Sequence, residues 1–265
     1  MSYSDLFAQC FPGTEKLGTS YLHWLYVDNP SGRMVGFNAF AGSRLVAHYA
    51  VIPVHVEIEG AQHLACWSLN TATHPEFQGR GLFTKLAELT YERAAEHGCI
   101  GVIGVANRNS VNGFVRRLAF AQLGQVSMRI GFGYRLLRGG AGTLHRIWTD
   151  PLIRWRLENP VRRYYRGACD GRVSIHALAP RTGTPILLGC VSKDSYAVHN
   201  LSSLPYCSAI QPRIVVGFGI DFGGTSLAVP NWILPSPWNV IYRPLSSNTG
   251  SRPDLSILGM DMDTF

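Results

Sequence analysis

The sequence lacks the long apolar runs and leader signals that would place it at a membrane or outside the cell. No uninterrupted apolar run approaches the roughly 18 to 20 residues that a membrane-spanning helix requires. The opening residues, Met-Ser-Tyr-Ser-Asp-Leu-Phe, contain neither the basic region nor the apolar region of a signal peptide. We therefore expect a chain that does not span a membrane and that resides in the cytoplasm.

Metal-binding and disulfide patterns are also missing. The nine histidines show no His-Glu-x-x-His spacing, and the six cysteines show no Cys-x-x-Cys spacing. We expect no metal cofactor and no disulfide framework, and most of the thiols should be buried as small apolar groups. The cysteines are Cys10, Cys66, Cys99, Cys169, Cys190 and Cys207.

Charged residues are scarce, at 15%, whereas 46% of the 265 residues are hydrophobic, enough for one large or two small domains. The formal net charge is +7, but the basic residues are dispersed except in Arg154–Arg156 and Arg162–Arg166. Such a cluster is most often a solvated helix face. It could also attract a polyanionic substrate or, with Tyr164 and Tyr165, bind nucleic acid. Charge alone does not separate these uses, and we rank nucleic acid last.

The most informative segment begins at Gln78-Gly79-Arg80-Gly81, a tight turn that leads into an amphipathic helix predicted from Leu82 to Gly98. A turn of this kind surrounds one small volume with free backbone N–H groups and the positive end of a helix dipole. That volume suits a pyrophosphate. An apolar run, Cys99–Ala106, then predicts a strand buried on both faces. Asn107 to Ser110 predict the cap of a second short helix.

Two other phosphate-binding patterns are excluded or disfavoured. A Walker-type loop would require Gly-Lys followed by Ser or Thr, which is absent here. A dinucleotide fold would require a third glycine and an acidic residue at the end of the next strand, and both are missing. An ordinary strand-turn-helix junction, in which the glycines serve only the bend, remains the alternative.

This order of strand, glycine loop, helix, buried strand and Asn-x-x-Ser helix resembles the GNAT superfamily of acyl-CoA-dependent N-acyltransferases. The resemblance rests on Gln78–Phe83 and on Asn107, Ser110, Phe114, Arg117, Leu118 and Phe120, and it covers about the first half of the chain. Three positions depart from the family pattern. Phe83 replaces a small residue, Val115 stands where many members have tyrosine, and Ala119 stands where they have glycine.

The resemblance implies a GNAT fold, an α/β (α+β) arrangement in which helices flank a mixed, mostly antiparallel central sheet. It also implies acetyl-CoA or another acyl-CoA as co-substrate and an amine as acceptor. The pantetheine arm would lie along the end of a strand at Leu69–Thr73. The implied acyl-CoA-binding residues are Leu69, Thr71, Thr73, Gln78, Gly79, Arg80, Gly81, Leu82, Phe83, Asn107, Ser110 and Phe114.

The catalytic groups are less clearly marked in the sequence. By the resemblance, backbone groups near Asn70 and Thr71 would stabilise the oxyanion. His48 is a possible general base because its intrinsic pKa is near neutral, although a lone histidine in a strand is more often structural. Because Val115 cannot donate a proton, either Tyr49, Ser110 or water would protonate the thiolate, or the thiolate would depart unprotonated into solvent. A cysteine acyl-enzyme is disfavoured, since apolar surroundings raise a thiol pKa.

The rest of the chain predicts a second half. Helices are expected over 3–11 and 15–27, and strands over 33–40, 44–58, 62–73, 172–179, 185–191, 196–201, 213–218 and 239–243, with a bend or bulge at Pro53. We place a boundary at the glycine-rich segment 136–142, which gives domains 1–138 and 143–265. Ile153–Pro160 is similar to Leu22–Pro30, and on this basis we interpret 143–265 as a degenerate GNAT-like or substrate-covering domain without its own phosphate loop.

The acceptor is not specified by these motifs. The Trp24–Pro30 segment and the length resemble GNAT-like proteins of bacterial surface-polysaccharide pathways, which modify amino groups on sugars and sugar nucleotides. We therefore expect a primary amine on an amino sugar, acylated by direct transfer in a ternary complex. A noncatalytic GNAT-like binding module is the main alternative because of Phe83 and Val115. The sequence does not indicate the oligomeric state.

Overall fold

The structure, a computed structural model, describes residues 2–11, 17–138, 143–169, 171–192, 201–207, 211–230, 236–246, 250 and 252–262. Its contacts divide the chain into two compact units. Unit 1 consists of Met1–His55, His63–Leu123 and Ile241–Arg252, and unit 2 consists of Val56–Gln62, Gly124–Val240 and Pro253–Phe265.

Unit 1 contains the segment with the glycine turn and a sheet whose strand order is β1-β2-β3-β4-β13-β5. β1 is antiparallel to β2, whereas β3 is parallel to β4. Four of its strands, β2, β3, β5 and β13, continue into unit 2. The elements are α1 (Tyr3–Cys10), α2 (Thr19–Tyr26), β1 (Val35–Ala41), β2 (Arg44–Ile58), β3 (Ala61–Thr73), η1 (Pro75–Phe77), α3 (Leu82–Glu96), β4 (Gly101–Ala106), α4 (Arg108–Arg117), β5 (Ala121–Gln125) and β13 (Asn239–Pro244).

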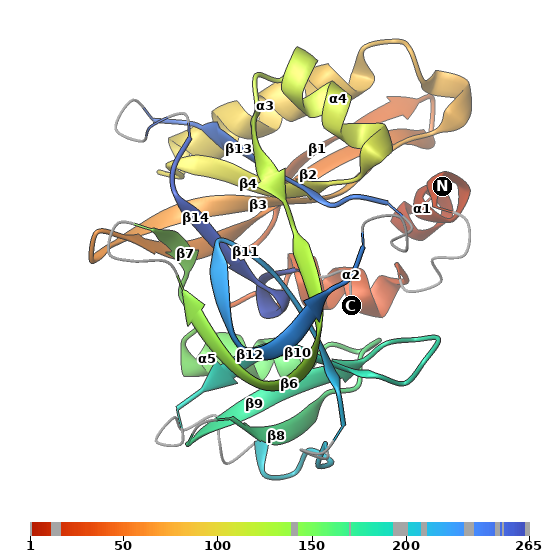
Figure 1. Ribbon diagram of the computed structural model, residues 1–265. Helices are drawn as coiled ribbons and strands as arrows, with labels where there is room; N and C mark the ends of the chain where they lie inside the picture. Colours follow the sequence, from red (N-terminus) through yellow and green to blue (C-terminus); the bar gives the residue numbers. More distant parts are fainter. Residues whose placement is uncertain are drawn as a thin grey trace. The chain divides into compact units, whose positions relative to one another are not determined.

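The two faces of β2 are buried against different helices, because successive side chains of a strand point to opposite faces. Ala47, Tyr49 and Val51 belong to a core cluster that includes Leu86 and Tyr91 of α3. On the other face, the His48 ring contacts rings from α1 and α2. In Figure 1, α3 and α4 lie on one side of β1–β4, and α2 lies on the other.

In unit 2 the strand order is β7-β14-β11-β10-β9-β8. β6 pairs with both β11 and β12, and the end of β2 pairs with β7 through Val56 and Arg146. Its elements are β6 (Ser127–Arg138), β7 (Leu144–Arg146), α5 (Asp150–Leu157), β8 (Tyr165–Cys169), β9 (Arg172–Leu178), β10 (Pro185–Val191), β11 (Arg213–Phe218), β12 (Ile220–Ala228), β14 (Leu255–Leu258) and η3 (Gly259–Asp261).

Part of unit 2 repeats the local order of unit 1. α2 and α5 are each followed by an Asn-Pro turn, in which the N–H of Ser31 donates to Asn29 Oδ1 (3.1 Å) and that of Val161 to Asn159 Oδ1 (3.0 Å). An antiparallel pair follows in both, β1 with β2 and β8 with β9. A parallel pair comes next, β3 with β4 and β10 with β11. The short sequence similarity therefore coincides with a repeated strand pattern.

Most predicted strands are present within one or two residues of their expected ends. Arg44–Ile58, Pro185–Val191 and Arg213–Phe218 have the expected bounds. β2 passes Pro53 without a break, since its pairing with β1 ends at Val35–Val51 and no β1 carbonyl then requires the missing N–H. The expected strand at 196–201 falls almost wholly on residues outside the described part of the chain.

The glycine-rich segment 217–224 contains an irregularity of the kind that a β-bulge produces. β12 has a register shift between Gly223 and Thr225 within its pairing with β6. The compact units divide near Leu123, and Ile241–Arg252 belongs to unit 1, whose core cluster contains Ile241. The division into 1–138 and 143–265 stays a prediction.

Ala119, which stands where the family pattern has glycine, has a backbone conformation that favours glycine. Its φ is +53°, in the left-handed region that favours glycine. A left-handed conformation costs an L-residue about 1–2 kcal/mol, whereas glycine loses only about 0.5–1 kcal/mol of extra chain entropy.

We expect Ala119→Gly to raise the free energy of unfolding by up to about 1 kcal/mol, measured by urea denaturation. The matched control is Ala95→Gly in α3, which should lower it by about 1 kcal/mol because Ala95 is exposed and helical. Equal destabilisation by both substitutions would contradict the strain at residue 119.

Candidate functional site

The site begins where two parallel strands of unit 1 stop pairing. β3 and β4 pair from Cys66–Val102 to Ser68–Gly104. Both strands then continue, β3 to Thr73 and β4 to Ala106, with no further pair between them in the described part of the chain. The β4-facing edge of Leu69–Thr73 is therefore open to a ligand with extended backbone-like amides. Leu69, Thr71 and Thr73 are each half-buried.

Asn70 lies in this open stretch with an unusual backbone conformation. Its φ is +49°, although it is a strand residue. Left-handed residues in strands redirect the backbone and are concentrated at functional sites. The redirected peptide groups are those that the sequence analysis assigns to the oxyanion.

The predicted phosphate loop is exposed and has room around its backbone. Gln78, Gly79, Arg80 and Gly81 are all exposed, and both glycines have a φ of +76°. Among the described residues, no atom lies within 4 Å of the Cβ position of either glycine. Gly81 is the N-cap of α3 and provides no side-chain cap, which leaves the first N–H groups of the helix available to an anion.

Two side chains of this loop are held by local contacts. Gln78 Nε2 donates to the carbonyl of Thr73 (3.1 Å), and Arg80 Nη2 donates to the carbonyl of Glu76 (3.0 Å). The Arg80 guanidinium also lies 4.7 Å from the ring centroid of Phe77. These contacts hold a positive charge next to the helix terminus, where it would add to the attraction for phosphate.

The Asn-x-x-Ser motif serves as a helix cap. The Asn107 side chain accepts hydrogen bonds from the N–H groups of Asn109 and Ser110 (3.0 Å each). The Ser110 hydroxyl donates to Asn107 Oδ1 (3.1 Å) and is half-buried. Asn107 and Ser110 therefore both take part in the cap of α4, Asn107 Oδ1 as the acceptor and the Ser110 hydroxyl as a donor to it.

Phe83 and Phe114 connect the two helices through the core. Their ring centroids are 5.2 Å apart at an edge-to-face angle of 89°. Phe114 is buried, and Phe83 is half-buried against the same core cluster. The substitution of a small residue by Phe83 is thus compensated on the core side, where Gly113 leaves space for its ring. Only the backbone of Phe83 remains suited to phosphate binding.

Tyr49 is not an accessible proton donor in this structure. Its side chain is fully buried, and its hydroxyl contacts Ser68 Oγ (2.8 Å) and Tyr91 Oη (2.5 Å). Burial raises its pKa above the ordinary value. Arg243, which the sequence analysis did not identify, lies 4.8 Å from the Tyr91 ring centroid and donates to the carbonyl of Leu118 (2.8 Å).

Tyr26, a residue that the sequence did not indicate, links His48 to Asn70 through hydrogen bonds. Tyr26 Oη lies 3.1 Å from His48 Nε2 and accepts from Asn70 Nδ2 at 3.3 Å. His48 is 1% exposed, and burial lowers its pKa to about 4. Such a group is neutral at pH 7 but too weak a base to remove a proton from an amine efficiently. Tyr26 has no sequence signal, because it lies in an apolar helix 44 residues before Asn70.

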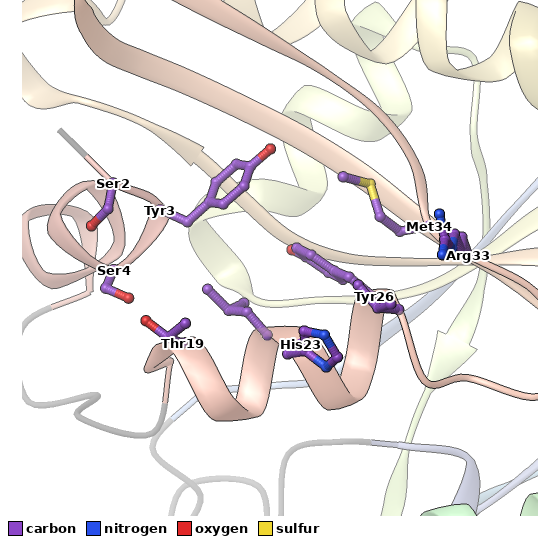
Figure 2. Close-up of a pocket in the computed structure, with 10 residues that line it drawn as sticks. Ser2, Tyr3, Ser4, Thr19, His23, Tyr26, Arg33 and Met34 are labelled. Carbon is purple, nitrogen blue, oxygen red and sulfur yellow. The ribbon is translucent and has the colours of Figure 1, made fainter.

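A cavity of about 410 Å³ lies beside this cluster in unit 1 (Figure 2). Tyr3 and Tyr26 point toward it from α1 and α2, together with Met34. Its lining is mostly apolar, with the exposed Arg33 contributing a positive charge. The lining residues are Ser2, Tyr3, Ser4, Thr19, Leu22, His23, Tyr26, Val27, Arg33 and Met34.

The remaining chemical groups have structural contacts. Cys66 and Cys99 are buried thiols whose sulfur atoms are 3.1 Å apart, and the hydrogen bond to Cys99 together with burial raises the pKa of Cys66. Tyr164, a possible stacking residue for nucleic acid, is buried. The described residues include no cluster of metal ligands and no helix long and apolar enough to cross a bilayer.

Comparisons with known proteins agree with this geometry. Residues 2–123 match the family model described as acetyltransferase (GNAT) domain. No match was found among curated proteins. Similar solved structures include a "Probable N-Acyltransferase" from Enterococcus faecalis, with 12% identity and a TM-score of 0.58 over 92% of this chain and 69% of that one.

Two further structures show the same likeness. Eis1 from Mycobacterium abscessus has 12% identity and a TM-score of 0.57 over 94% of this chain and 72% of its own. A GCN5-related N-acetyltransferase from Anabaena variabilis has 12% identity and a TM-score of 0.55 over 92% and 70%. The chain therefore has a mixed α/β fold like that of GNAT proteins, and its N-terminal domain supports acyl transfer as the general activity.

The buried His48 should make stability depend on pH. The unfolded chain binds a proton at this residue below about pH 6.5, whereas the folded chain does so only near pH 4. The free energy of unfolding should thus fall as pH decreases from about 6.5 to 4, by up to about 3 kcal/mol from this residue.

Denaturation at a series of pH values, for the parent and for His48→Gln, isolates this contribution. His176, whose pKa is lowered to about 3 by burial and by Arg213, adds a similar dependence that remains in both proteins. The slope between pH 4 and 6.5 should be shallower in His48→Gln. Identical slopes would show that His48 is not a buried neutral group.

Proposed function

We propose that this protein transfers an acetyl or other short acyl group from acyl-CoA to a primary amine. The observation that carries the proposal is the open edge of β3 after Ser68, in the same domain as the exposed glycine turn before α3. An extended pantetheine amide chain suits the first feature, and a pyrophosphate suits the second. GNAT domains in general take these substrates.

Binding of acyl-CoA would use backbone groups more than side chains. In this proposal the N–H groups of residues 79–83 receive the pyrophosphate, and the Arg80 guanidinium neutralises part of its charge. Leu69, Thr71 and Thr73 contact the pantetheine arm. Asn107 and Phe114 support the site from α4, the first as its cap and the second through the Phe83 ring.

The chemistry is a direct transfer within a ternary complex. The amine nitrogen attacks the thioester carbonyl carbon, the C–N bond forms, and the C–S bond breaks as the thiolate leaves with a proton. Backbone N–H groups near Asn70 and Thr71 would stabilise the oxyanion. We propose Ser110 or water as the proton donor instead of Tyr49, because the Tyr49 hydroxyl lies between Ser68 and Tyr91 in the core; Ser110 would first have to release its hydrogen bond to Asn107. Water is the simplest base, since His48 is buried and weakly basic.

We assign the acceptor to the cavity between α1 and α2, and we propose an amine on an amino sugar or a sugar nucleotide. The aromatic rings of Tyr3 and Tyr26 offer faces for the apolar side of a sugar ring. Arg33 would attract the phosphates of a nucleotide-linked sugar. We expect these reactions to occur in the cytoplasm, where acyl-CoA is available.

Unit 2 fits a cofactor-free, GNAT-like half. It repeats the helix, Asn-Pro turn and strand-pairing senses of unit 1. However, the connection from β10 to β11 has no glycine from Ser192 to Pro212, so it has no counterpart of the loop at 78–81. We propose that this half stabilises or covers the first instead of binding a second acyl-CoA.

A thermal-shift comparison with acetyl-CoA, free CoA and an oligonucleotide at two salt concentrations separates the alternatives. Stabilisation by both CoA species supports the enzyme, and stabilisation by none of them supports a noncatalytic module. A salt-sensitive response to the oligonucleotide alone would indicate nucleic-acid binding. An acceptor screen that follows CoA release would then identify the amine.

Gly81→Asp should abolish stabilisation by acetyl-CoA. The new carboxylate would repel the pyrophosphate, and aspartate tolerates a left-handed conformation better than most residues. Gly98→Asp is the matched control, because Gly98 has a φ of +81°, equally open surroundings and a place at the other end of α3.

At a concentration 100-fold above Kd, acetyl-CoA should stabilise the parent and the control by about 2.7 kcal/mol and leave Gly81→Asp unaffected. A folded Gly81→Asp protein that is stabilised as much as the parent would exclude the loop as the phosphate site.

Because the loop occurs once, calorimetric titration of the full chain should give one acetyl-CoA per chain. Residues 78–81 would provide the only pyrophosphate site, so Gly81→Asp should reduce the number of bound acetyl-CoA molecules per chain from one to zero. If a second site existed, this variant would still bind half as much acetyl-CoA as the parent. Two equivalent sites in the parent would refute a cofactor-free second half.

A further inference from the structure

Five polar side chains form a continuous hydrogen-bonded chain through unit 1. Asn70 Nδ2 is 3.3 Å from Tyr26 Oη, which is 3.1 Å from His48 Nε2. His48 Nδ1 is 2.7 Å from Asn38 Oδ1, and Asn38 Nδ2 donates to Tyr3 Oη at 2.8 Å. The chain joins α1, β1, β2, α2 and β3, and two of its members, Tyr3 and Tyr26, line the cavity.

The two amide side chains fix the direction of every bond. Asn38 Oδ1 can only accept, so His48 Nδ1 carries the proton and His48 Nε2 is an acceptor. The Tyr26 hydroxyl must then donate to His48, and its oxygen is left to accept from Asn70. Donation therefore runs from Asn70 to Tyr3 without a conflict, and aligned bonds in a buried chain strengthen one another.

This direction excludes one role for Tyr26 and suggests another. Its proton is committed to His48, and burial raises its pKa, so it is not placed to protonate a leaving thiolate. Its bond to Asn70, however, is made at the one residue of β3 with a positive φ. A non-glycine residue in that conformation costs about 1–2 kcal/mol unless surrounding contacts hold it.

We infer that Tyr26 and His48 are positioning residues: through the Asn70 side chain they hold the left-handed turn in β3 and thereby direct its free backbone N–H groups toward the thioester carbonyl. The inference rests on the proposed function, because it assumes that acyl-CoA lies along this edge. The inference explains what holds the oxyanion site in its geometry. The contacts come from Tyr26 of α2 and His48 of β2, and β2 pairs with the edge of β3 opposite the one that faces the ligand.

The test compares the affinities of full-length variants for acetyl-CoA and for CoA by calorimetry. Only acetyl-CoA has the thioester carbonyl, so the difference between the two ligands reports on its hydrogen bond. The parent should bind acetyl-CoA more tightly than CoA. Tyr26→Phe should lower the affinity for acetyl-CoA about 3- to 10-fold, the effect of one hydrogen bond, and leave that for CoA unchanged.

Tyr91→Phe is the matched control, since Tyr91 is also a buried tyrosine of unit 1 but hydrogen bonds to Tyr49 outside the chain. It should change neither affinity, although it removes a hydroxyl from the core. His48→Gln keeps a hydrogen-bond donor and an acceptor on a side chain of similar reach. Its affinity for acetyl-CoA should lie between those of the parent and of Tyr26→Phe. This variant also provides the test if Tyr26→Phe does not fold.

Glycine at position 70 separates positioning from other roles. Because glycine adopts a positive φ without strain, Asn70→Gly should keep the preference for acetyl-CoA. Adding Tyr26→Phe to Asn70→Gly should then have no further effect, so the two changes would not be additive.

Three results would overturn the inference. They are an equal loss of affinity for acetyl-CoA and CoA in Tyr26→Phe, a selective loss of affinity for acetyl-CoA in Tyr91→Phe, or additive effects on the acetyl-CoA affinity in the double variant. Equal affinities of the parent for the two ligands would also overturn it, while leaving acyl-CoA binding intact. A parent that binds neither ligand would instead refute the proposed function, and the inference with it.

Discussion

β3 stops pairing with β4 after Ser68 but continues to Thr73, and the backbone N–H and C=O groups on this edge of β3 are then open to a ligand. Such groups are costly if they are buried and unsatisfied, so the opening must face water or a ligand. The other features of the candidate site are arranged around this opening. The glycine turn and the α3 N-terminus follow β3 after the short helix η1, and the α4 cap at Asn107 follows β4 directly.

The alternation of side chains along β2 places Tyr49 and His48 on opposite faces of the strand. Tyr49 and its neighbours on one face form the core beneath α3 and α4, which fixes the position of the α3 N-terminus. His48, on the other face, lies at the centre of the hydrogen-bonded chain that reaches Asn70. The same strand thus supports the proposed phosphate site from one face and the proposed oxyanion site from the other. A one-residue slip in its register would exchange these faces and disrupt both sites.

Unit 2 repeats part of the strand pattern of unit 1 without the glycine turn. β8 to β11 pair in the same senses as β1 to β4, yet the connection before β11 has no glycine. What distinguishes unit 1 is local: the turn with Gly79 and Gly81, both at positive φ, leads directly into α3, and β3 contains the left-handed Asn70. Each of these features is a backbone property, which agrees with a proposed ligand that is recognised through N–H groups.

The sequence by itself determined the features that depend on local physics. Hydrophobic periodicity predicted β2, α3, β10 and β11 closely, and the residues from Gln78 to Ser110 predicted a glycine turn and a capped helix that the structure contains. The departure at Ala119 was also visible in the sequence, and its positive φ follows from the same local geometry.

Only the tertiary structure decided which distant residues meet. In the structure Tyr26 hydrogen bonds to both His48 and Asn70, and Tyr49 lies in the core against Tyr91. Arg243 donates to the carbonyl of Leu118. Side chains such as Tyr26 have an apolar body and one polar atom, so periodicity identifies their burial but not their partner. The partner is set by strand order and helix placement, and these depend on contacts between residues far apart in the chain.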